Sequence, residues 1–295
     1  MNALEFFLKA NLYLALFYAC YHLGLRRHTF FSLNRAYLLA SVVAALTLPL
    51  VELSLQTVEK LPVPVGVISL PVAVLAAPTE STGPDWETIG YGAYGLVAAG
   101  LFLRFLLRLT GVARLIARSE RVPQNGFTLV RPDSERVPSF SFFRYLVLNP
   151  EDARHHADVV CRHELVHIRQ WHSADVLFFE LAQILFWINP VMLLYQRAIR
   201  QVHEFLADRG ATTVEDSTQY ATFLVEYAFS AQPDTLTNSF FNPTLLKERI
   251  QMLHRRATSR WAVWKYGLVL PLALGLLAMT SAPEKVQSLV SSISA

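Results

Sequence analysis

The stretch "VVCRHELVHIRQWH", residues 159–172, decides what kind of protein this is. His163 and His167 are four residues apart, and Glu164 follows the first of them. On a helix, residues at this spacing lie on one face, one turn apart, as two imidazoles must to bind one metal ion. The alternative is that two histidines fall at helical spacing by chance. The rest of the chain must decide between these two interpretations.

A His-Glu-x-x-His helix typically supplies two ligands of a catalytic zinc ion, and its glutamate acts as a general base. Bound zinc lowers the pKa of its water from about 16 to about 7. Glu164 is placed to accept a proton from that water and to return it to the leaving amine of a cleaved peptide bond. Catalytic zinc usually has three protein ligands and one open position, so this chemistry requires a third ligand.

A second motif, "QVHEFLADRGA" at residues 201–211, supplies a candidate for the third ligand. Glu204 follows His167 by 37 residues, and Asp208 lies one helical turn beyond Glu204. Glu204 as a ligand, with Asp208 hydrogen-bonded to a ligand imidazole, would complete a His/His/Glu zinc site. The residues between the motifs suffice for an antiparallel helix and its return. The alternative is that both carboxylates lie on an ordinary solvated helix face.

The composition indicates a membrane protein, because 53% of the 295 residues are hydrophobic and only 17% are charged. Four apolar runs are each about long enough to cross a bilayer as a helix, near residues 4–23, 36–53, 88–107 and 263–280. We therefore predict a mainly α integral membrane protein with four transmembrane helices. An α+β domain at residues 110–262 is inserted before the last span.

The distribution of charge predicts the orientation. Basic residues cluster between the first two runs, after the third run and before the fourth, whereas the few charged residues of segment 52–85 are mainly acidic. By the positive-inside rule, the inserted domain faces the cytoplasm, and the loop 54–87, the tail 281–295 and both termini face outward. No basic stretch is interleaved with aromatic residues on a soluble face, so direct nucleic-acid binding is not expected.

Within the inserted domain, the patterns predict a basic helix to about residue 121, then two strands in "GFTLVRP" and "PSFSFFRYLVLNP". Helices are expected at about 151–171, 191–212, 218–230 and 242–256. Residues 174–195 are apolar but contain Asp175, Glu180 and Gln183, which are costly in hydrocarbon. A buried core helix or a shallow membrane-dipping helix therefore fits this segment better than a full crossing.

Several further residues are candidates with two open interpretations. His172 and Asp175 either orient the zinc helix or cap the following one. His203 is a candidate for oxyanion stabilisation, but it points about 100° away from Glu204 on a helix, so a surface histidine is the favoured interpretation. The strand at 139–148 is a candidate for binding a peptide by edge pairing, with its substrate contacts at Phe140, Ser141 and Phe142. The alternative is that the phenylalanines of this strand are core or membrane-contact residues.

The motifs "HELVHIRQWHSAD", "FWINP" and "HEFLADRGA", in this order and spacing, resemble the BlaR/MecR-type membrane zinc peptidases. "PSFSFFRYLVLNP" and "FNPTLLKERIQML" resemble the segments that flank this core, and the resemblance covers most of residues 1–280. It implies a cytoplasmic, gluzincin-type zinc peptidase domain between helices of a bacterial inner membrane. One zinc ion per chain is implied at His163, His167 and Glu204, with Glu164 as the catalytic residue.

The resemblance also implies a role in signalling, in which an outside stimulus triggers cleavage of the protein itself or of a cytosolic, repressor-like regulator. The expected partners are this protein substrate, the lipid bilayer and, as a candidate assembly, a second copy of the chain. Antibiotic-sensing members carry a penicillin-binding domain after the last span. Only about 15 residues follow here, without a Ser-x-x-Lys motif, so β-lactam sensing is not expected. Either the chain is a short member or an outer domain has been lost or trimmed.

Two other functions compete with a signalling peptidase. Membrane proteases of the quality-control or prenyl-protein-processing type share the two motifs, but they often place two full spans between the histidines and the glutamate, and 36 residues leave little room for that. A receptor or scaffold with a relic site is the third possibility. The intact Glu164 argues against it, because a relic has no reason to keep the general base.

Overall fold

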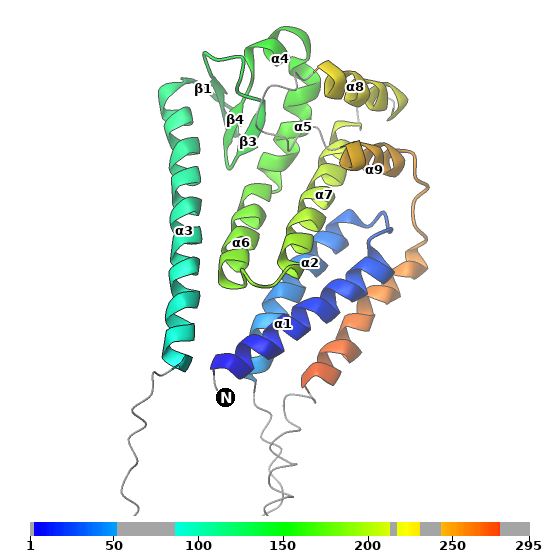
Figure 1. The fold of residues 1–295 in the computed structure, drawn as a ribbon. Coiled ribbons are helices and arrows are strands. Elements are labelled where there is room, and N and C mark those ends of the chain that lie inside the picture. Colours follow the sequence, from blue (N-terminus) through cyan, green and yellow to red (C-terminus); the bar gives the residue numbers. More distant parts are fainter. Residues whose placement is uncertain (1–2, 52–85, 213–216, 231–242, 278–295) are drawn as a thin grey trace, which may run out of the picture.

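The computed structural model describes residues 3–51, 86–212, 217–230 and 243–277 (Figure 1). Three apolar helices stand beside a domain made of a small sheet and six helices. The apolar helices are α1 (Ala3–Cys20), α2 (Phe31–Thr47) and α3 (Trp86–Arg118). The domain helices are α4 (Pro150–His155), α5 (Ala157–Arg169), α6 (His172–Leu185), α7 (Val191–Ala211), α8 (Ser217–Ser230) and α9 (Pro243–Leu253).

Three stretches of helix are long and apolar enough to cross a bilayer. In the first, Ala3–Leu25, α1 continues through the π-helical turn η1 (Tyr21–Leu25). In the second, Phe31–Leu50, α2 continues through the 3-10 turn η2 (Leu48–Leu50). The third is Trp86–Arg118. These stretches coincide with the first three predicted runs. The fourth run begins within the 3-10 helix η3 (Arg260–Leu268) and remains helical to residue 277. Its last residues, the tail 281–295 and residues 54–85 lie outside the described residues, so the fourth span stays a prediction.

The apolar helices and the domain share one core. Leu14 of α1, Leu38 of α2 and Tyr195 of α7 belong to the same cluster of buried side chains, together with Phe179 of α6. The Tyr195 hydroxyl also lies 3.0 Å from the Ser41 hydroxyl of α2. Because this contact surface is fully buried, the domain is packed directly onto the apolar helices.

The hairpin of α6 and α7 extends alongside the apolar helices (Figure 1). At its turn, the Phe186 ring lies 5.8 Å from the Phe7 ring of α1, and the Leu185 carbonyl accepts a hydrogen bond from Tyr94 of α3. Exposed leucine and isoleucine side chains surround the turn, at Leu181, Leu185, Ile188, Leu193 and Leu194. The segment 174–195 thus combines a buried helix with an apolar tip that lies beside the predicted spans.

The sheet has four strands, whereas the sequence predicts two. The first predicted strand is present, the second is split into two strands, and the strand at residues 120–124 was not predicted. The strands are β1 (Glu120–Gln124), β2 (Phe127–Arg131), β3 (Phe140–Phe142) and β4 (Tyr145–Val147). Their order is β1-β2-β4-β3, in which β2 and β4 run parallel and the other neighbours run antiparallel. The chain therefore begins a strand at Glu120, where a helix was expected to end, and β3 forms one edge of the sheet.

The second predicted strand is split because the chain reverses at Phe143, which has a φ of 51°. A bulky side chain rarely adopts this left-handed conformation, and a contact must hold it. The Phe143 N–H donates to the Ser173 hydroxyl at the start of α6, at 2.9 Å. A contact 30 residues away in the sequence thus creates the β3–β4 hairpin.

The predicted helices of the domain are present with small changes of boundary. The segment expected at 151–171 is divided at His156, whose φ of −136° ends α4 before α5 begins. The bounds of α7, α8 and α9 agree with the predictions to within a few residues. The helix that carries the first motif is therefore α5, and the helix that carries the second is α7.

Candidate metal centre

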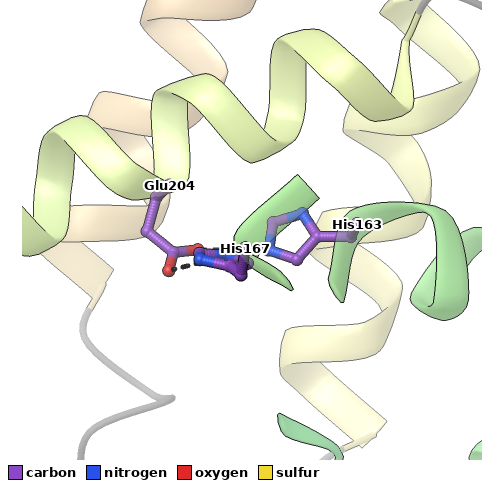
Figure 2. Close-up of side chains that lie close together, drawn as sticks. All are labelled: His163, His167 and Glu204. Carbon is purple, nitrogen blue, oxygen red and sulfur yellow. Dashed lines mark hydrogen bonds and ion pairs between the residues drawn. The ribbon is translucent and has the colours of Figure 1, made fainter. Parts of the chain in front are cut away.

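Two imidazoles and one carboxylate converge between α5 and α7 (Figure 2). The Nε2 atoms of His163 and His167 are 3.2 Å apart. Glu204 Oε2 lies 3.6 Å from His163 Nε2, and Glu204 Oε1 lies 3.9 Å from His167 Nε2. A tetrahedral zinc ion with bonds of 2.0–2.2 Å holds its ligand atoms about 3.3 Å apart. The spacing and chemistry of these donors therefore fit one zinc ion.

Among the described residues, this is the one group of three or more metal-binding side chains whose ligand atoms all lie within 4.8 Å of one another. The helices can approach this closely because α7 carries a glycine opposite α5. A Cβ atom built on Gly210 would lie 2.5 Å from Cγ2 of Val166, the residue before His167. Any side chain at residue 210 would therefore push the two halves of the site apart.

His163 is oriented by a hydroxyl from α8 and a carboxylate from α7. Its Nδ1 lies 3.0 Å from the Tyr220 hydroxyl, which donates its proton to Asp208 Oδ1 at 2.9 Å. Because the hydroxyl has only one proton, it must accept a hydrogen bond from Nδ1–H of His163. The lone pair of that imidazole is then on Nε2, which faces His167 and Glu204. Asp208 was predicted to hydrogen-bond a ligand imidazole directly, but it acts mainly through Tyr220, since its own Oδ1 is 3.5 Å from Nδ1.

Arg249 of α9 joins the two carboxylates of α7. Its Nε donates to Asp208 Oδ2 at 2.9 Å and its Nη2 to Asp208 Oδ1 at 2.5 Å, while Nη1 lies 3.1 Å from Glu204 Oε2. Burial raises the pKa of Glu204, but Arg249 and His163 together outweigh it and hold the pKa well below its usual range. Glu204 is therefore a carboxylate, the form that binds a metal ion.

His167 is oriented by side chains at the corner between α5 and α6. Its Nδ1 lies 2.8 Å from Nδ1 of His172, whose Nε2 lies 3.3 Å from Oε1 of Gln170. An amide oxygen only accepts, so His172 donates from Nε2 and accepts at Nδ1. His167 then donates from Nδ1 and keeps its lone pair on Nε2, toward the site. Of the two roles that the sequence left open for His172, the structure supports orienting the zinc helix.

His203 is buried, so the favoured interpretation as a surface histidine is wrong. Its side chain is 3% exposed, its Nε2 lies 2.7 Å from Asp175 Oδ2, and its ring stacks on the His172 ring at 3.9 Å. Burial lowers the pKa of His203, despite the opposing effect of Asp175. The reason is that α6 and α2 cover the face of α7 that carries residue 203. His203 does not line the cavity at the site, which also removes it as an oxyanion donor.

Asp175 is likewise buried and serves neither as a cap nor as a direct partner of a zinc-helix histidine. Its carboxylate accepts from His203 and from Arg35 of α2, whose Nε is 2.6 Å from Oδ2. Burial alone would raise the pKa of Asp175. The hydrogen bonds from His203 and Arg35 lower this pKa by more than burial raises it, so the net shift is downward. Asp175 thus connects three helices, and its link to His167 is indirect.

A cavity of about 570 Å³ opens at the three converging side chains. Glu164, Phe140 and Ser141 line it, so the candidate base and the sheet edge face the same space. Phe142 does not line it and packs instead in the small core beneath the sheet. Side chains of α8 and α9 form an apolar wall that includes Phe223, Leu224, Tyr227, Leu246 and Ile250. The arrangement can hold an extended, partly apolar peptide beside a metal ion.

Residues 144–253 match the family model described as BlaR1 peptidase M56. This part of the chain is similar to the M56 peptidases. The match begins in the β3–β4 hairpin, ends with α9 and contains both motifs, so the resemblance to BlaR/MecR-type peptidases is confirmed. The match supports a membrane-associated metallopeptidase. No curated protein matches the chain.

Three residues that support the M56 site escaped the sequence analysis: Gln170, Tyr220 and Arg249. Gln170 lies inside the first quoted stretch, but no local pattern assigns a glutamine to a histidine. Tyr220 and Arg249 follow His163 by 57 and 86 residues, and neither position has a local pattern that assigns its side chain to the site. Their roles become visible only when α8 and α9 are packed against α7.

Proposed function

We propose that this protein is a membrane-anchored zinc metalloendopeptidase that cleaves itself or a cytosolic regulatory protein in transmembrane signalling. One observation carries the proposal: His163, His167 and Glu204 bring three ligand atoms within 4.8 Å of one another, in a cavity that Glu164 also lines. Two imidazoles and a carboxylate are the ligand set of many catalytic zinc sites. The M56 match supports the same chemistry.

Each residue has a separate task in the proposed reaction. His163, His167 and Glu204 would hold zinc, which when bound polarises the scissile carbonyl and makes a water acidic. Glu164 would accept a proton from the attacking water and return it to the nitrogen of the leaving amine. The hydrogen bonds at Nδ1 of both histidines keep their Nε2 lone pairs directed at one point, so the ligand set is preorganised.

The sheet edge is the proposed binding site for the substrate backbone. β3 has no neighbouring strand on its outer side among the described residues, and its Phe140 and Ser141 line the cavity. An extended peptide can pair with such an edge and pass the site with alternate side chains directed into the cavity. The apolar wall from α8 and α9 favours a large apolar side chain on the substrate.

The signalling part of the proposal rests on the contact between the domain and the apolar helices. α6 and α7 share a buried core with α1 and α2, so a displacement of these helices reaches the domain without passing through a linker. The positions of the basic residues support a domain on the cytoplasmic side of a bacterial inner membrane. A homodimer stays a prediction.

Both alternatives have an observation against them. A protease with two full spans between its motifs would need two helices of about 20 residues there. The connection here holds α6, which has 14 residues, and the first part of α7. A relic site has no need for oriented imidazoles or for Glu164, yet both are present.

The test is Glu164→Gln in the full chain. We expect the purified variant to keep about one zinc ion per chain and to lose cleavage by roughly 10²–10⁴-fold, because it lacks only the proton acceptor. Metal analysis and proteomics of cells with parent or variant chain measure the two effects. Glu151→Gln, the same change at an exposed position of α4, is the matched control and should behave as the parent.

Two outcomes would contradict the proposal. A Glu164→Gln chain that cleaves as fast as the parent would show that Glu164 is not the base. A parent chain that binds zinc but changes no peptide relative to the variant would favour the relic receptor.

A further inference from the structure

Arg35 was expected to serve as a topology signal in the loop between two spans, but it lies within α2 and points into the domain. Its guanidinium makes three contacts there. Nε donates to Asp175 Oδ2 at 2.6 Å, and Nη2 donates to Asp175 Oδ1 at 3.1 Å and to the Gln170 carbonyl at 2.7 Å. The planar fork of arginine thus holds the end of α5 and the first turns of α6 at once.

Two routes lead from these contacts to His167. The shorter route passes through Gln170, whose carbonyl accepts from Arg35 and whose side-chain oxygen accepts from His172. The longer route passes from Asp175 to His203, whose ring lies flat on the His172 ring with an interplanar angle of 10°. Both routes end at His172, which accepts the Nδ1–H of His167.

These groups are shielded from water, so alternative partners are scarce. The side chains of Arg35 and Asp175 are 21% and 8% exposed, and His172 is 2% exposed. A buried hydrogen bond that is lost cannot be replaced by a bond to solvent, so a shift of Arg35 must be followed by its partners. Movement of α2 relative to α6 would therefore change the direction of the His167 lone pair.

We propose that Arg35 is a positioning residue through which the apolar helix α2 sets the orientation of the metal ligand His167. This inference rests on the proposed zinc site and adds to it the point at which the apolar helices reach it. It assigns to α2 a direct influence on metal binding and on the reaction. Arg35 touches neither the ligand atoms nor the cavity.

The test is Arg35→Gln in the full chain in detergent, with cobalt(II) as a spectroscopic substitute for zinc. We expect zinc to bind about tenfold more weakly, as is typical for loss of a residue behind a ligand, and the visible absorption bands of cobalt to shift. A residue that only held α2 against α6 would lower the unfolding temperature but leave the cobalt bands of the folded protein unchanged.

The matched control is Arg26→Gln. Arg26, the residue that follows η1, also forms an ion pair with the domain, at Glu248 of α9. Among the described residues, no hydrogen bond leads from that pair to His167. This variant should keep the parent's zinc affinity and cobalt spectrum. If it weakens zinc as much as Arg35→Gln does, the effect is general loosening and the inference is overturned.

His203→Phe supplies a second, independent variant if Arg35→Gln does not fold. It keeps an aromatic ring on His172 and leaves the contact between Arg35 and Asp175, but it removes the hydrogen bond that joins them to the stack. We expect the cobalt bands to shift in this variant as well.

A folded Arg35→Gln protein with the parent's zinc affinity and spectrum would overturn the inference while leaving the proposed zinc site standing. A folded His203→Phe protein with the parent's affinity and spectrum would overturn the longer route alone, because the route through Gln170 stays intact. A parent chain that binds zinc without cleaving any protein would overturn the peptidase and leave these metal measurements valid. A parent chain that binds no zinc would end both proposals.

Discussion

His163 and His167 offer the same atom to the same site, but different parts of the molecule hold them. His163 is held through Tyr220 by Asp208, which comes from α7. His167 is held by His172 at the corner of α5 and α6, behind which stands Arg35 of α2. One candidate ligand is thus held within the domain, and the other at its junction with the apolar helices.

The difference separates a support inside the domain from a support at its boundary. The support of His163 contains a buried carboxylate with a bidentate arginine, which packing within the domain keeps in place. The support of His167 crosses the boundary to α2 and depends on how two packed units sit against each other. A zinc site needs all its ligands, so loosening one of them is enough to change its affinity.

The two imidazoles should be equally necessary for zinc binding, and removing each of them is the strongest test of this. We expect His163→Ala and His167→Ala each to reduce zinc from about one ion per chain to near zero, because a structured site loses one of three ligands. Metal analysis of the purified protein measures this. His155→Ala, an exposed histidine on α4, is the control. If one variant keeps its zinc, that histidine is not a ligand.

The next largest effect is expected at the carboxylate behind His163. Asp208→Ala leaves the Arg249 guanidinium buried with only Glu204 as an acidic partner, and we expect a loss of about 3 kcal/mol in the free energy of unfolding. Unfolding in detergent without zinc separates this loss from loss of metal. Adding Arg249→Leu should recover part of it. A cost below about 1 kcal/mol would show that this support is no firmer than an exposed ion pair.

Gly210→Ala tests the contact that brings both supports together. The added methyl group would collide with Val166, and overpacking of this kind costs about 1–3 kcal/mol. Val166→Ala in the same chain should remove the collision, so the two changes together should cost less than their sum in a double-mutant cycle. Gly111→Ala in α3, where no atom lies near the added Cβ, is the control. If the two costs add, the contact between residue 210 and Val166 does not set the distance between α5 and α7.

The smallest expected effects concern the two groups that hydrogen-bond the imidazoles of His163 and His167. Tyr220→Phe removes the hydroxyl behind His163, and His172→Phe removes the acceptor behind His167. We expect each change to weaken zinc binding by about tenfold and to cost about 1 kcal/mol in stability. Competition with a zinc chelator measures the affinities, with Tyr91→Phe on the exposed face of α3 as the control. A change that leaves zinc binding unaltered would show that its histidine is oriented by packing alone.

Much of the candidate site could be predicted because it depends on local periodicity. The interval of four residues between His163 and His167 places both on one face of any helix. The helix α5 itself was predictable from its apolar pattern. On α7, Glu204 and Asp208 are separated by the same interval of four residues. The sheet was predicted less well, because Phe143 reverses the chain only with the help of Ser173.

The sequence by itself determined the candidate ligands, the candidate base, the resemblance to a peptidase family and the apolar helices, since each is encoded within a short window of residues. The tertiary structure decided which side chains stand behind the ligands. Arg35, His203 and Arg249 look like ordinary polar residues in the sequence. Their partners are 28 to 140 residues away, and only the packing of α2, α6, α7 and α9 removes the water that would otherwise have solvated them.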